Sequence, residues 1–130
     1  MRRNVSVLIV DDNPGFVQRM SGLLGEIEAV NQIYSAGNYD DAIKLIDQQT
    51  HDMVLLDINL PGKNGISLLE QLKERGRVSG VIMLSNHSGI YYRNKCKKLG
   101  ARHFLDKTTE FEKVPCIINE LLVDNKISLS

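Results

Sequence analysis

The sequence of 130 residues has no tryptophan, only two cysteines and three prolines, and no hydrophobic run of membrane-spanning length. Cys96 and Cys116 lack the CxxC spacing of a redox or metal site, so both are expected to be reduced thiols. The apolar N-terminal stretch VSVLIV has the length of a strand, and no small-residue cleavage site follows it. The sequence therefore predicts a cytoplasmic chain without membrane insertion.

An excess of charge of either sign is also missing. Lys+Arg 16 against Asp+Glu 16 gives a formal net charge of +0, so no long-range field attracts nucleic acid or an anionic membrane. Residues 93–102 do contain five basic side chains and no acid. Because aromatic residues do not alternate with them, we interpret this segment as a solvated helix face or a contact for an acidic partner, and expect no direct nucleic-acid binding.

The composition is that of an ordinary folded domain, with 42% hydrophobic and 25% charged residues and no biased tract. The length leaves no room for a second folded unit beside the first. We expect one domain over residues 1–123 and a short C-terminal tail over residues 124–130.

Strand and helix patterns alternate along the chain. Apolar runs at 5–10, interrupted only by Ser6, and at 53–56 and 81–84 predict strands that are buried on both faces of a parallel sheet. The more polar segments 29–34 and 101–105 suit its edges. Apolar residues recur at helical spacing between the strands and after the last one. Pro14 fits the first turn of the first helix, Asn38 and Asp40 are candidate caps of the second, and the last helix is predicted to begin near Val114. Five βα units with short links predict an α/β fold, a doubly wound five-stranded parallel sheet with five helices.

Polar and charged side chains follow four of these strands. Asp11 and Asp12 come after the first strand, Asp57 after the third, Ser85 after the fourth and Lys107 after the fifth. The carboxyl ends of parallel strands meet at one edge of the sheet, where ligands bind. Three neighbouring carboxylates need positive charge nearby, and Lys107 together with Mg²⁺ would supply it.

This set suits phosphoryl transfer. A carboxylate beside Mg²⁺ can attack a phosphoryl group, and Asp57, at the end of a rigid central strand, is the candidate nucleophile. Lys107, Ser85 and the metal would stabilise the charge on the phosphoryl oxygens. Each residue taken alone has a simpler explanation as a cap, a loop residue or a solvated side chain. Their occurrence at successive strand ends favours a shared site.

The segments LIVDDN, LLDINLPGKNG, MLSN and GARHFLDK together resemble the receiver domain of bacterial response regulators over nearly the whole chain. The resemblance implies a flavodoxin-like strand order, Asp57 as the phosphoacceptor, and Mg²⁺ ligands from Asp11, Asp12, Asp57 and the Asn59 carbonyl. It also implies that Ser85 and Lys107 are the switch hydroxyl and the phosphate-binding lysine.

Further roles follow from the same resemblance. Phe104 matches an aromatic position that moves with Ser85, although many relatives have a tyrosine there. His87 and Asn59 occupy positions that tune dephosphorylation, with an ordinary loop histidine as the alternative for His87. Thr108 stands where relatives often have a proline with a cis peptide bond, and because cis bonds without proline are costly, trans geometry and strain at Lys107 are both open.

The resemblance also implies partners. The phosphoryl donor would be a sensor histidine kinase or a histidine phosphotransfer protein, and an output protein would bind the face made by the fourth helix, fifth strand and fifth helix. Phosphorylation could also drive homodimer formation. The chain would be a switch and not a turnover enzyme. Two alternatives stay open: the receiver part of a longer DNA-binding regulator, and an interaction domain that works without phosphorylation.

Overall fold

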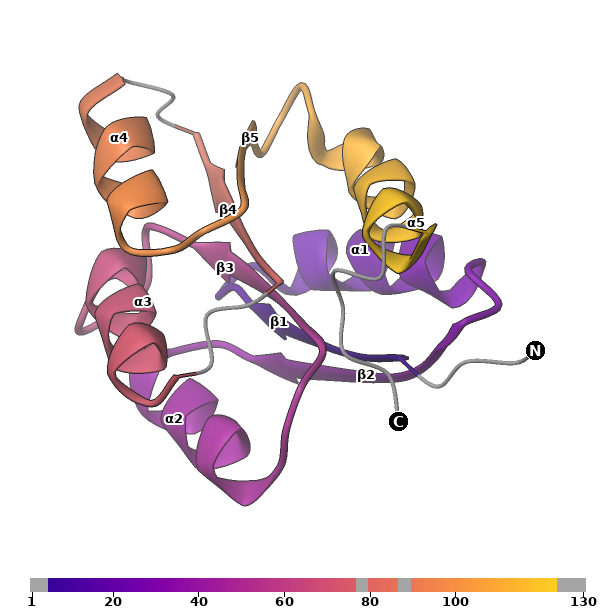
Figure 1. Cartoon of the computed structure of the whole chain (residues 1–130). Coiled ribbons are helices and arrows are strands. Elements are labelled where there is room, and N and C mark those ends of the chain that lie inside the picture. The colour runs from indigo at the N-terminus through magenta and orange to yellow at the C-terminus, as the bar shows by residue number, and fades with distance from the viewer. Residues whose placement is uncertain (1–4, 77–79, 87–89, 124–130) are drawn as a thin grey trace.

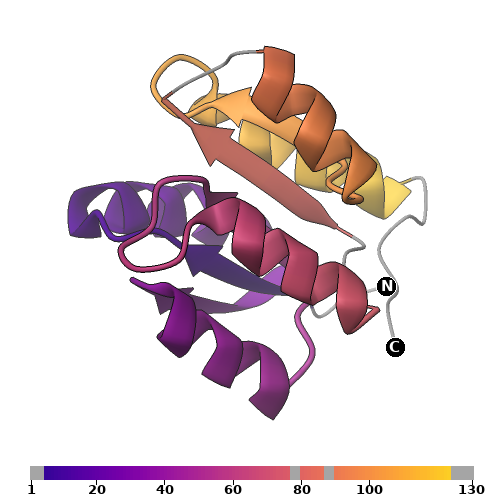
Figure 2. The same cartoon turned by 90° about the vertical axis from the view of Figure 1, so that its left-hand side faces the viewer.

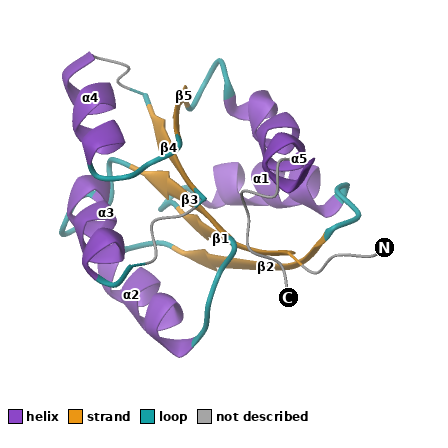
Figure 3. Ribbon diagram, in the orientation of Figure 1, coloured by secondary structure: helices purple, strands orange, loops and turns teal. Residues whose placement is uncertain are grey.

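The computed structural model describes residues 5–76, 80–86 and 90–123. Strands and helices alternate throughout this part of the chain, and a short 3₁₀ turn, η1, precedes the last helix (Figures 1 and 3). In chain order the elements are β1 (Val5–Val10), α1 (Pro14–Gly25), β2 (Val30–Ala36), α2 (Tyr39–Gln48), β3 (Met53–Asp57), α3 (Gly65–Glu74), β4 (Val81–Ser85), α4 (Ile90–Lys98), β5 (His103–Asp106), η1 (Phe111–Lys113) and α5 (Val114–Val123).

The five strands form one parallel sheet in the order β2-β1-β3-β4-β5. Helices α1 and α5 pack on one face of this sheet, and α2, α3 and α4 pack on the other (Figures 1 and 2). The predicted α/β, doubly wound fold with flavodoxin-like strand order is therefore confirmed. The strand order changes direction between β1 and β3, which is where such sheets place their ligand sites.

Burial follows the predicted pattern. Every residue of β1, β3 and β4 is buried, because helices cover both faces of these central strands. The polar strands β2 and β5 form the two edges, as expected. Their bounds differ from the prediction: β2 continues to Ala36, which pairs with Val10, and β5 begins only at His103 because the Ala101 amide still donates to the Cys96 carbonyl at the end of α4.

The helix starts are mostly as predicted. Asn13 caps α1 by accepting from the Phe16 amide, and Pro14 occupies the first position. Asn38 caps α2, so the alternative cap, Asp40, is wrong and that residue lies in the first helical turn. Helix α5 begins at Val114 as expected, whereas η1 before it was not predicted.

Both cysteines are free thiols, and Cys96 is buried within α4 while Cys116 is exposed on α5. Burial raises the pKa of the Cys96 thiol to about 11, which keeps it protonated and unreactive. Among the described residues, no helix has the length and apolar character needed to cross a membrane. The predicted tail, residues 124–130, lies outside the described residues, so the domain boundary stays a prediction.

Candidate functional site

Three charged side chains meet at the carboxyl edge of the sheet. Asp57 is the last residue of β3, and Asp11 follows β1, where its amide donates to the Ala36 carbonyl at 3.0 Å. Lys107 follows β5, and its amide donates to the Ser85 carbonyl at 2.9 Å. Backbone hydrogen bonds of the sheet therefore fix the positions of all three residues independently of the contacts between their side chains.

The Lys107 ammonium lies between the two buried carboxylates. Its Nζ is 2.7 Å from Asp11 Oδ2 and donates a longer hydrogen bond of 3.4 Å to Asp57 Oδ2. The shorter contact has the distance of an ion pair, and Asp11 Oδ2 is otherwise a buried oxygen without a further hydrogen-bond partner among the described residues. A buried carboxylate oxygen in this position is suited to a further positive ligand.

The carboxylates can hold a metal ion. One oxygen each from Asp11, Asp12 and Asp57 lie within 4.8 Å of one another, and Asp12 is exposed to solvent. Carboxylate oxygens that face water suit Mg²⁺, which keeps several water ligands and usually binds one or two carboxylates. The residues present therefore fit the predicted Mg²⁺ site.

Asn59 lies beside this cluster in the loop after β3. Its backbone amide donates to Asp57 Oδ1 at 3.1 Å, while the residue itself is exposed. This hydrogen bond fixes one Asp57 oxygen, and Lys107 contacts the other. The predicted role of the Asn59 carbonyl as a metal ligand stays a prediction.

Ser85 and Phe104 lie on the same face of the sheet. Met83 and Phe104 are paired between β4 and β5 and pack in the same cluster, and Ser85 follows Met83 by two residues, so its side chain points to that face. Ser85 is fully buried and Phe104 is partly exposed. The Arg93 guanidinium of α4 lies 5.0 Å from the centre of the Phe104 ring and donates to the Phe104 carbonyl at 3.1 Å.

The loop after β5 is held by local hydrogen bonds. Asp106 Oδ1 accepts from the amides of Thr108 and Thr109, each at 2.9 Å, and these bonds lower the pKa of Asp106. Every peptide bond in the described residues is trans, including the one after Lys107. Of the alternatives left open there, trans is correct. His87 lies outside the described residues, so its predicted tuning role stays a prediction.

Burial dominates the electrostatics of the site. It raises the pKa of Asp57 above its ordinary value of 3.8, and the Asp11 charge adds to this, whereas the Asn59 amide and Lys107 act in the opposite direction. Burial lowers the pKa of Lys107, but the Asp11 and Asp57 carboxylates outweigh it, so the net pKa is raised. Without a metal the site thus holds a carboxylate that is costly to ionise.

Replacing Asp57 with asparagine is expected to stabilise the metal-free protein. A carboxyl whose folded pKa is raised destabilises the fold above that pKa, and the penalty disappears as the pH falls to its unfolded value. Urea unfolding in EDTA should show Asp57→Asn more stable than wild type at about pH 7, with a smaller difference at about pH 4. Equal stability at both pH values would contradict the assigned burial penalty.

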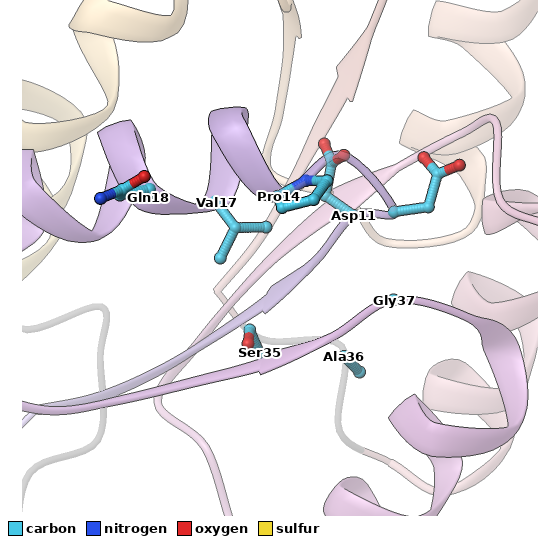
Figure 4. A pocket seen from close by; sticks show the side chains of 8 residues that line it. Asp11, Pro14, Val17, Gln18, Ser35, Ala36 and Gly37 are labelled. Atoms are coloured by element: carbon cyan, nitrogen blue, oxygen red, sulfur yellow. The ribbon is translucent and has the colours of Figure 1, made fainter.

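A pocket of about 330 Å³ opens beside the acidic cluster. Figure 4 shows Pro14, Val17 and Gln18 of α1 on one side and Ser35, Ala36 and Gly37 at the end of β2 on the other. Asp11 and Asp12 also line it. The Asp11 and Asp12 carboxylates can therefore be approached from solvent between α1 and β2.

Comparison with known families matches residues 7–119 to the response regulator receiver domain. The chain belongs to this family. The transcriptional regulatory protein MalR of Bacillus subtilis is 29% identical over 123 residues, which cover 95% of this chain and 52% of that protein. The DNA-binding transcriptional activator EvgA of Escherichia coli is 29% identical over 105 residues, 79% of this chain and 50% of that protein. The receiver domain thus spans about half the length of these relatives.

Solved receiver structures share the fold. The receiver domain of the Francisella response regulator 1452 superposes with a TM-score of 0.84 at 24% identity, over 94% of this chain and 99% of that one. The response regulator domain of Thermotoga maritima CheB gives 0.80 at 21% identity, over 95% and 97% of the two chains. Receiver domains of this family work with kinases and output domains in two-component systems.

The sequence did not reveal one neighbour of the receiver's lysine. Phe16 is one of the apolar residues that recur at helical spacing after the first strand, yet the Lys107 Nζ lies 4.7 Å from the centre of its ring. Its place five residues after Asp11 is the only sequence signal that could have drawn attention to it.

Proposed function

We propose that this receiver domain is a phosphorylation-dependent signalling switch in a two-component phosphorelay. Asp57 accepts a phosphoryl group from a histidine on a sensor kinase or a phosphotransfer protein. The observation that carries the proposal is the meeting of three carboxylates with the Lys107 ammonium at the switch point of the sheet.

The transfer step uses the Asp57 carboxylate as the nucleophile. One of its oxygens attacks phosphorus, a new P–O bond forms, and the bond from phosphorus to the donor histidine nitrogen breaks with its electron pair left on the imidazole. Mg²⁺ bound by Asp11, Asp12 and Asp57, with the Asn59 carbonyl as a further ligand, would neutralise charge on the phosphoryl oxygens. The Asn59 amide and the Lys107 ammonium orient the two Asp57 oxygens beforehand.

The remaining residues couple this chemistry to the surface. After phosphorylation the Lys107 ammonium moves toward the phosphoryl oxygens, and the Ser85 hydroxyl donates a hydrogen bond to one of them. Phe104 then moves into the space that Ser85 leaves. Asn59 and His87 set the rate at which water removes the phosphoryl group. The domain changes only its own phosphorylation state, so it acts as a switch and not as a turnover enzyme.

The switch acts in the cytoplasm through protein contacts. The output surface is formed by α4, β5 and α5, with a phosphorylation-driven homodimer as one form of output. A second candidate is the receiver part of a longer DNA-binding regulator. The names of MalR and EvgA, and the half-length match to both, support that alternative.

The intact mass of the protein after incubation with acetyl phosphate tests the proposal. We expect one phosphoryl addition that requires Mg²⁺, because the buried carboxylates need a cation before an anionic donor can approach. The Asp57→Asn variant should show none. A hydroxylamine-labile phosphate on that variant would disprove the assignment of the nucleophile.

Absence of any addition on the wild-type protein is followed by a Mg²⁺ titration. If the protein binds Mg²⁺ but is not phosphorylated by acetyl phosphate, it is next incubated with a phosphorylated histidine phosphotransfer protein as the donor. If that donor also fails, the domain works without phosphorylation and the proposal is wrong.

A further inference from the structure

The aromatic face of Phe16 lies against the ammonium of Lys107. The Nζ is 4.7 Å from the ring centre, within the range of a cation–π interaction. Phe16 is 2% exposed and the Lys107 side chain 12% exposed, so little water weakens the contact. We propose that Phe16 is a positioning residue for phosphoryl transfer, whose ring holds the Lys107 ammonium beside Asp57. This role rests on the function proposed above.

Two segments of the fold fix the Phe16 ring. At the start of α1, the Phe16 amide donates to the side chain of the capping residue Asn13 at 3.1 Å. Across the site, the ring of Phe111 on η1 meets Phe16 edge to face, with ring centres 6.3 Å apart. Phe16 is therefore held by Asn13, which closely follows Asp11 in the chain, and by Phe111, which closely follows Lys107.

The carboxylates alone leave the position of the ammonium poorly defined for catalysis. Nζ lies closer to Asp11, at 2.7 Å, than to Asp57, at 3.4 Å, although Asp57 is the proposed phosphoacceptor. A cation bound by Asp11 would weaken the attraction of that carboxylate for Lys107. The attraction of the Phe16 ring does not depend on whether the carboxylates bind metal. The ring thus keeps the ammonium within reach of Asp57 when the carboxylates no longer do so.

The test compares rate constants of phosphorylation by acetyl phosphate at saturating Mg²⁺, followed by intact mass. Phe16→Leu is expected to lower the rate constant roughly threefold to tenfold, the size of a partly shielded cation–π contact. Phe16→Met, a second apolar substitution without a ring, should show the same loss, and Phe16→Tyr, which retains a ring, should keep most of the rate. Phe111→Leu is the comparison variant: it removes the ring that supports Phe16 but leaves the ring that contacts Lys107, so its loss of rate should be smaller than that of Phe16→Leu.

A double-substitution cycle separates positioning from a general effect on folding. In a Lys107→Ala background, Phe16→Leu should cause no further loss of rate, because the ring then has no ammonium to hold. A full threefold to tenfold loss in that background would overturn the proposal. So would an unchanged rate in Phe16→Leu, or equal losses in Phe16→Leu and Phe111→Leu.

A second measurement does not require phosphorylation. The ε-methylene protons of Lys107 should show an upfield NMR shift from the Phe16 ring that Phe16→Leu abolishes and Phe111→Leu preserves; absence of this shift would overturn the contact. If the wild-type protein takes up a phosphoryl group neither from acetyl phosphate nor from a phosphorylated histidine phosphotransfer protein, the proposed function is wrong, and the positioning role is then wrong as well. If it takes up the group at a rate that Phe16→Leu leaves unchanged, only the positioning role is wrong.

Discussion

Replacing Gly65 with alanine is expected to destabilise the receiver domain by about 3 kcal/mol or more. Gly65 is the first residue of α3, and a Cβ there would collide with the backbone carbonyl oxygen of Asp57. It would also lie 2.9 Å from the Asp57 carbonyl carbon and from Ile58 Cα, and backbone atoms cannot rotate away as a side chain can. The Gly65 amide donates to the Ile58 carbonyl at 2.7 Å, so the close approach is part of the normal structure.

The change should be followed by urea unfolding. Gly22→Ala is the matched control, because its Cβ in α1 would meet nothing within 4 Å. The free energy of unfolding of that variant should equal the wild-type value or exceed it by up to about 1 kcal/mol, as expected when alanine replaces glycine inside a helix. Wild-type stability in Gly65→Ala would show that α3 can move away from Asp57, contrary to the geometry described.

Replacing Asp12 with alanine is expected to reduce Mg²⁺ affinity at least about tenfold while leaving the fold intact. Asp12 contributes one of the three clustered carboxylates, but unlike Asp11 and Asp57 it is exposed to solvent. Its loss therefore removes a ligand without opening a cavity. Calorimetric titration of Mg²⁺ measures the affinity, and thermal unfolding in EDTA checks the fold.

Asp40→Ala serves as the control for that experiment. Asp40 is also an exposed acid, near the start of α2, and it lies outside the carboxylate cluster. It should bind Mg²⁺ like the wild-type protein, although the overall charge changes equally in both variants. Equal Mg²⁺ affinity of Asp12→Ala and Asp40→Ala would contradict the assigned metal site.

The central strands could be predicted from the sequence because helices cover both of their faces. Residues 5–10 are buried and are apolar except for Ser6, and such runs are distinctive. The edge strand β5 was less well placed. Ala101 is apolar like a strand residue, but its amide donates to the Cys96 carbonyl near the end of α4, so the residue belongs to the end of that helix.

The cluster of site residues was also predictable, since parallel strands bring their carboxyl ends to one edge. The distances between side chains within this cluster could not be predicted from the sequence. Lys107 Nζ lies nearer to Asp11 than to Asp57 and lies against the Phe16 ring, and these contacts depend on how the side chains pack. An apolar residue at helical spacing gives no sign that its ring will contact a charge, and a glycine gives no sign of which backbone will approach it.

The parallel arrangement of the sheet bears on how the domain is made. In the described part of the chain every strand pair is parallel, so none is a local hairpin, and Asp11 and Asp57 meet Lys107 only when β5 has been added at the far edge. Contacts between such distant parts of a chain form slowly during folding. During synthesis, Asp11 and Asp57 therefore emerge before the lysine that offsets their repulsion. A nascent chain that ends before β5 lacks Lys107 and therefore lacks part of the site on which the proposed phosphoryl transfer depends.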